Sequence, residues 1–149
     1  MRWILLLCLS VGAVGCAANG GQGAQAVKED KLTVLPEDSR WKLVSSDIEG
    51  LQAKASEAVR LEIAGGTLRG DTGCNQFFAG YSMDAAGAIS MQPVVQSKRA
   101  CAEPERNAVE RALLDALREL QSASQRGDEL VLHTAAGRLV FADDALVAE

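Results

Sequence analysis

The spacing of apolar residues changes from that of strands to that of a helix near residue 100, and this change constrains the fold most. Before it, Val59, Leu61 and Ile63 alternate with charged residues, which is the period of a half-buried strand. After it, apolar residues recur every three or four positions, as in an amphipathic helix. Many short strands with one helix predict an α+β fold.

We expect short strands bounded by turn residues at 41–44, 59–63, 67–70, 76–83, 88–91, 130–133 and 138–141. Gly65-Gly66 predicts a tight hairpin turn between the second and third of these. In strand 76–83, alternation places Phe77, Ala79 and Tyr81 on one face and Phe78 on the other. We therefore expect Phe77 and Tyr81 to contribute to the core.

The helix is predicted from Pro104 to about Gln121, because proline is favoured in the first turn. Its apolar stripe consists of Val109, Ala112, Leu113, Ala116, Leu117 and Leu120. Residues 122–126 are then expected to link the helix to a turn at Gly127.

Residues 1–15 have the composition of a secretory signal peptide. Arg2 precedes an uncharged run of thirteen residues, which is shorter than a membrane-spanning helix requires. Ala13-Val14-Gly15-Cys16 resembles the lipobox of bacterial lipoproteins, in which the cysteine is diacylated and becomes the mature N-terminus. This resemblance predicts lipid on Cys16, and Ala17 after it predicts, by analogy, an outer-membrane lipoprotein facing the periplasm. Ordinary cleavage nearby, which would release a soluble periplasmic protein, is the alternative.

The remaining chain is long enough for one domain. We expect a lipidated N-terminus and flexible tether at 16–38, since this stretch begins with small and polar residues, a single domain at 39–142, and a C-terminal tail at 143–149. The net charge is −5, and the sequence has no run of Lys and Arg. This balance argues against nucleic acid as a partner and against attraction to anionic membranes by charge.

One dense segment carries a resemblance to a known family. Gly73-Cys74-Asn75-Gln76-Phe77-Phe78-Ala79-Gly80-Tyr81, with Ser97 to Cys101 further along, resembles the META domain, also called the heat-shock lipoprotein family. Trp41-Lys42-Leu43, the helix and the last two strands extend the resemblance over residues 39–142, and Ser97 stands where the family usually has threonine. The residues that match the family motif are Gly73, Cys74, Asn75, Phe77, Gly80 and Tyr81.

The resemblance carries expectations about fold and role. It implies an antiparallel sheet of about seven to eight short strands, curled into a partly open barrel around one helix. It also implies a protein of the bacterial envelope that is not an enzyme, with a phenotypic link to stress and antibiotic tolerance.

The cysteines predict a crosslink. Once Cys8 leaves with the signal and Cys16 is acylated, the mature domain holds Cys74 and Cys101. An even pair in an oxidising compartment favours a disulfide, which would stabilise the domain by about 3–4 kcal/mol. Two buried free thiols are the alternative. A redox-active pair is disfavoured, because no Cys-x-x-Cys spacing is present to lower a thiol pKa.

Few residues are available for catalysis or metal binding. His133 is the one histidine, and it is expected on a strand beside a turn. A zinc site requires about four ligands, and a hydrolase requires a base beside its nucleophile. We therefore predict no catalytic residue, no metal ligand and no cofactor. Asn75 is expected to stabilise a tight turn by bonding nearby backbone, and Gly70 to serve the turn before Cys74.

These observations favour a non-enzymatic, lipid-anchored envelope protein. It would support envelope integrity or stress tolerance by binding another envelope component, such as a second envelope protein. The alternative is a binding module for a lipid or small apolar ligand, because a sheet curled around a helix can hold a cavity at its mouth. A further alternative is an inhibitor of a secreted enzyme, although Ala85-Ala86-Gly87 offers little for such a loop.

Overall fold

The computed structural model describes residues 28–51 and 54–146. The signal peptide, Cys16 and the tether up to residue 27 lie outside these described residues. The strands are β1 (Glu29–Lys31), β2 (Ser39–Ser46), β3 (Arg60–Ala64), β4 (Thr67–Asp71), β5 (Gln76–Met83), β6 (Ile89–Met91), β7 (Val95–Gln96), β8 (Leu120–Arg126), β9 (Glu129–Thr134) and β10 (Gly137–Asp143). The helices are α1 (Pro104–Arg118) and the 3-10 helix η1 (Lys54–Ala58).

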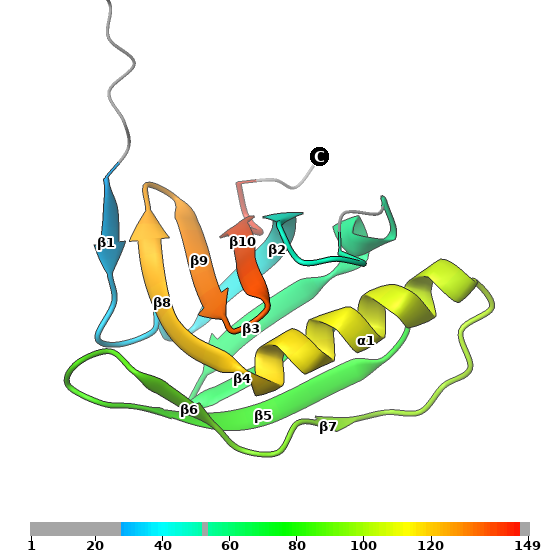
Figure 1. Cartoon of the computed structure of the whole chain (residues 1–149), viewed down its shortest axis with the longest axis horizontal. Coiled ribbons are helices and arrows are strands. Elements are labelled where there is room, and N and C mark those ends of the chain that lie inside the picture. Colours follow the sequence, from blue (N-terminus) through cyan, green and yellow to red (C-terminus); the bar gives the residue numbers. More distant parts are fainter. Residues whose placement is uncertain (1–27, 52–53, 147–149) are drawn as a thin grey trace, which may run out of the picture.

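The strands form one antiparallel sheet that curls around α1 (Figure 1). Nine strands follow one another in the order β1-β8-β9-β10-β2-β3-β4-β5-β6, and β7 pairs with β5 off this path. β6 also lies close to β8, so the curled sheet approaches closure as a partly open barrel. The α+β class and the curled sheet around one helix are confirmed, although the sheet has ten strands rather than seven or eight.

The additional strands are those whose sequence carries little alternation. β1 and β7 have three and two residues, which is too short for a period to show. β1 lies inside the stretch predicted to be tether, and it pairs with β8 through Glu29 and Arg126. The sheet therefore begins ten residues before residue 39.

The predicted C-terminus of the helix was wrong by about one turn. α1 ends at Arg118, and β8 begins at Leu120 and replaces both the last helical residues and the expected linker. Leu120 fits the helical stripe by spacing, but its backbone pairs with Thr134 of β9 instead. Tertiary pairing thus decides a segment whose local sequence favours neither state strongly.

The hairpin turn and the core follow the sequence pattern. Gly65 and Gly66 both adopt positive φ, of 58° and 69°, as a two-residue hairpin turn requires. Alternate residues of the sheet face the apolar stripe of α1 and form one core; the most deeply buried of them include Leu43, Leu61, Ile63, Leu68, Phe77, Leu113, Leu117, Leu132 and Phe141. Residues 28–146 therefore hold a core of their own, and every described strand has its partner within this range. Among the described residues, no helix is both long enough and apolar enough to cross a membrane.

Candidate functional site

The family motif begins in a tight turn between β4 and β5. Gly73 adopts a φ of 84°, and its N–H donates to Asp71 Oδ1 at 2.6 Å. The Thr72 N–H donates to the Asn75 carbonyl at 2.8 Å, and Thr72 Oγ1 accepts from the Asn75 N–H at 2.9 Å. Thr72 and Asn75 are 0% and 2% exposed. The turn is therefore closed by its own backbone and by the threonine hydroxyl.

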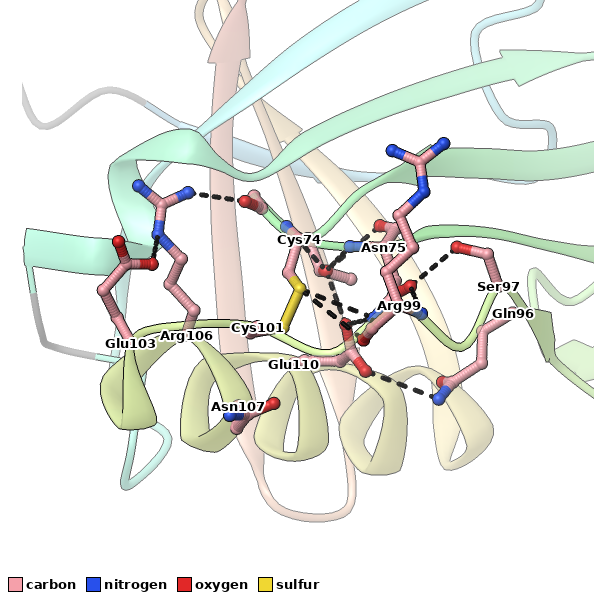
Figure 2. The surroundings of a disulfide bond; sticks show 12 residues. Cys74, Asn75, Gln96, Ser97, Arg99, Cys101, Glu103, Arg106, Asn107 and Glu110 are labelled. Carbon is pink, nitrogen blue, oxygen red and sulfur yellow. Dashed lines mark hydrogen bonds and ion pairs between the residues drawn. A yellow bond between two sulfur atoms is a disulfide. The ribbon is translucent and has the colours of Figure 1, made fainter.

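The side chain of Asn75 does not serve that turn as expected; it reaches across to two other parts of the chain. Its Oδ1 accepts from Ser97 Oγ and from the Arg99 N–H, each at 2.7 Å. Its Nδ2 donates to the Arg99 carbonyl at 3.2 Å and to Glu110 Oε2 at 2.9 Å (Figure 2). All four hydrogen-bonding positions of the amide are used. Asn75 thus joins the motif turn to residues 97–99 and to α1.

Glu110 is the site residue that sequence reasoning missed. It lies on the buried face of α1 and is 8% exposed. Its Oε2 accepts from Thr72 Oγ1 at 2.8 Å and from Asn75, and its Oε1 accepts from Gln96 Nε2 at 3.4 Å. A buried carboxylate is costly unless it is hydrogen-bonded, and here neutral donors do this. The signal was available, since Glu110 stands three residues before Leu113 on the apolar stripe.

A disulfide fastens the same turn to the chain before α1. Cys74 and Cys101 are bonded, with 5.8 Å between their Cα atoms and a sequence separation of 27. Arg106, in the first turns of α1, donates from Nη1 to the Gly73 carbonyl at 2.5 Å and pairs through Nε with Glu103 at 2.8 Å. The turn is thus held from both sides (Figure 2).

The chemistry of this cluster is that of a crosslink. Ligand atoms of Cys74, Cys101 and Glu110 all lie within 4.8 Å of one another, which is metal-site spacing. However, the two sulfur atoms are bonded to each other, so neither is a thiolate that could ligate a metal or attack a substrate. The oxygens of Glu110 already accept hydrogen bonds from Thr72, Asn75 and Gln96.

The other motif residues pack β5 into the molecule. Phe77 is 3% exposed and lies in the core, as expected, and Tyr81 is partly buried and packs against the core. The Tyr81 hydroxyl donates to Glu37 Oε1 at 2.8 Å. Burial raises the pKa of Tyr81 above its ordinary value of 10.0, and the hydrogen bond from Tyr81 lowers the pKa of Glu37 below 4.5. Gly80 lies beside the side chain of Gln92.

His133 lies in a second polar cluster, on the opposite part of the sheet. Its Nε2 is 2.7 Å from Ser124 Oγ and 3.1 Å from Glu29 Oε1. A catalytic triad needs the carboxylate on the ring nitrogen that does not face the serine, whereas here both groups face Nε2. The cluster instead joins β1 to β8 and β9. The hydrogen bond from Ser124 is the main cause that lowers the pKa of Glu29.

A hollow of about 890 Å³ lies on the face of the sheet turned away from α1, and we call it the outer-face pocket. Five of its residues stand opposite one another on β2, β3, β4, β5 and β7: Arg40, Glu62, Arg69, Phe78 and Val95. The sequence-based expectation was a cavity at the mouth of the curled sheet, whereas this pocket lies on the outer face of β2, β3, β4, β5 and β7.

Comparison with known proteins agrees with this fold. The chain resembles two proteins of known NMR structure, one of them from Burkholderia xenovorans, at 19% and 18% identity; both have a TM-score of 0.58, over 72% and 75% of this chain and 83% and 94% of theirs. It also resembles a DUF4847-family protein from Bacteroides vulgatus ATCC 8482, at 10% identity and a TM-score of 0.51, over 70% of this chain and 92% of that one. These likenesses show the fold alone.

The sequence itself identifies the family. No curated protein matches the chain. The family model for the META domain matches residues 30–145, which include β2 to β10, the Gly73–Tyr81 motif and both bonded cysteines. The chain therefore belongs to the META domain family.

Proposed function

We propose that this protein is a non-enzymatic lipoprotein of the bacterial envelope. Acyl chains on Cys16 would anchor it, and its META domain would support envelope integrity or stress tolerance by binding another envelope component. One observation supports the non-enzymatic part: the cysteine of the motif is held in a disulfide and the carboxylate beside it is occupied by hydrogen bonds. Cys74 forms a disulfide with Cys101, and Asn75 donates a hydrogen bond to Glu110.

Two features support a location in the bacterial envelope. Disulfides persist in oxidising compartments such as the periplasm, and the bond between Cys74 and Cys101 fits such a place. The lipobox-like Ala13-Val14-Gly15-Cys16 provides an anchor. Burial of acyl chains contributes about 0.8 kcal/mol per methylene, so two chains hold a protein stably where one does not.

Replacing the anchor residue tests this proposal. Cys16→Ser is expected to abolish labelling by a fatty acid and to move the protein from the membrane to the soluble fraction, because the acylated thiol is lost. Ala17→Asp is the matched control: it keeps labelling, and by the sorting analogy it moves the protein from the outer to the inner membrane. Unchanged labelling and membrane partition of Cys16→Ser would contradict the lipoprotein assignment.

The outer-face pocket favours a second candidate, a binding module for a lipid or small apolar ligand. Phe78 and Val95 are 53% and 49% exposed there, and pockets of such volume suit small ligands. The chain from Lys28 onward, isolated from cells without detergent and weighed by native mass spectrometry, is expected to carry a bound molecule. Native mass spectra that show only the mass of the chain itself, whatever the growth condition of the cells, would exclude this candidate.

A further inference from the structure

We propose that the outer-face pocket binds a medium-chain carboxylate, with its alkyl chain on Phe78 and Val95 and its head group on Arg69. This inference rests on the second candidate function above. It adds the chemical class of the ligand and the residues that would contact its head group and its alkyl chain.

The apolar half of the pocket is a pair of exposed side chains. Phe78 of β5 and Val95 of β7 are register partners, so they stand directly opposite each other. Each leaves about half of its surface in contact with solvent, at 53% and 49%. The other exposed large apolar side chains of the described residues, Val34, Val44 and Leu146, do not line this pocket. Phe78 and Val95 thus provide an exposed apolar contact surface for an alkyl chain.

Three arginines line the charged half of the pocket, and Arg69 is the one of them without a carboxylate partner within 4 Å among the described residues. Arg60 pairs with Asp144 at 3.0 Å, and Arg40 stands 3.9 Å from Glu62. Asp71 accepts from the Gly73 N–H. Within the described residues, Arg69 has no carboxylate within 4 Å although it stands opposite both Glu62 and Phe78. A guanidinium matches a carboxylate through two parallel hydrogen bonds, so Arg69 suits a single acidic head group.

The spacing of these groups fits one amphiphile. Neighbouring strands lie about 4.8 Å apart, so Arg69 on β4 and Val95 on β7 are separated by roughly 10 Å across Phe78. A ligand with an acidic head at Arg69 would therefore lay its first carbons on Phe78 and later ones on Val95. One unpaired guanidinium among the described residues of the pocket, in a protein of net charge −5, does not suit an anionic membrane surface, which needs clustered cations.

Titration of the chain from Lys28 onward tests the site, because this range holds every described strand and α1. Decanoate, decanol and decyltrimethylammonium, kept below their micellar concentrations, share one chain length and differ in charge. Decanoate is expected to bind most tightly. Arg69→Gln is expected to weaken decanoate binding about tenfold and to leave decanol binding unchanged, because only the charged hydrogen bonds are lost. Phe78→Ser and Val95→Ser are each expected to weaken both.

Two exposed residues outside the pocket provide matched controls. Val44→Ser removes an apolar side chain that is 45% exposed, and Arg111→Gln removes a guanidinium on α1. Both variants are expected to bind decanoate like the parent chain. Equal affinity for decanoate and decanol would overturn the role of Arg69, and binding of none of the three compounds would overturn the site. Dimerisation that Phe78→Ser abolishes would show that a second copy covers the patch and would also overturn it. None of these results depends on the labelling of Cys16, so the anchor and the site fail separately.

Discussion

At the scale of single residues, Asn75 has the most contacts to lose. Its amide bonds Ser97, Arg99 and Glu110, and all of these bonds are at least partly buried. Asn75→Ala leaves several polar groups unpaired, including the buried carboxylate of Glu110. We expect the free energy of unfolding to fall by about 3 kcal/mol in urea denaturation. Asn107→Ala, an exposed asparagine on α1, is the control and should change stability by less than about 0.5 kcal/mol.

Gly70 shows a different constraint from the one predicted. It lies inside β4 rather than in the turn, and a Cβ there would meet the Arg60 carbonyl oxygen and, at 2.8 and 2.9 Å, the ring of Phe77. Gly70→Ala should therefore lower the free energy of unfolding by about 1–3 kcal/mol. Gly80→Ala is the matched control, because the atoms in its way are the movable end of Gln92. Equal losses in the two variants, measured by urea denaturation, would contradict this account.

The sequence predicted the residues of this site better than their partners. Spacing and motif located Cys74, Asn75 and Cys101, and alternation placed Phe77 in the core. The partners of Asn75 lie 22 to 35 residues away, so no local pattern could indicate that they pair with it, even though the place of Glu110 on the apolar stripe marks it as unusual. Gly70 was expected in a turn because glycine is common in turns. The structure gives another reason for a glycine at this position, which is the close approach of Arg60 and Phe77 to its backbone.

At the scale of elements, Asp47 fastens the end of β2 to β10. Its Oδ1 accepts from the Arg138 N–H at 2.5 Å, and its Oδ2 pairs with Arg138 Nε at 3.0 Å. The backbone hydrogen bond from Arg138 is the main cause that lowers the pKa of Asp47 below its ordinary value of 3.8. A carboxyl group whose pKa is depressed in the folded state stabilises the fold at pH values above its ordinary pKa. That stabilisation is lost as the pH falls through the folded-state pKa.

We therefore expect the difference in melting temperature between the parent and Asp47→Asn to be constant above about pH 5 and to shrink below about pH 3.8. Melting curves recorded at steps from neutral pH down to about pH 2.5 check this. Asp128→Asn, at an exposed turn between β8 and β9, should follow the parent throughout. A difference that persists unchanged at the lowest pH would mean that Asp47 does not act through its charge.

The boundary between α1 and β8 shows why elements are harder to predict than periods. Val109, Leu113 and Leu117 predicted the helix and its buried face correctly. Leu120 satisfied the same period, yet it opens a strand because β9 provides backbone partners along 120–126. β9 follows β8 directly in a hairpin, yet it is the pairing with β9, and not the local sequence of β8, that makes residues 120–126 a strand. β1 is similar, since only its pairing with β8 makes it a strand.

At the scale of the whole molecule, the crosslinks of the family motif and the candidate binding surface involve different residues, although Phe78 of the Gly73–Tyr81 segment lines the pocket. The bonds of Cys74 and Asn75 hold the start of α1 to the sheet, whereas Arg69, Phe78 and Val95 lie on the face away from it. The residues of these crosslinks therefore identify the fold but do not indicate which ligand binds. The fold class, the helix and most strands were predictable from period and resemblance, but the outer-face pocket was not, because it arises from register across five strands.

The redox state of the mature protein tests the central claim most directly, since the claim is that the motif is a closed crosslink. Protein taken from the cell envelope and quenched in acid is alkylated before and after reduction, and labelled residues are found by mass spectrometry. We predict no free thiol before reduction, and labelling of Cys74 and Cys101 after it. Labelling of both cysteines without reductant would contradict the account.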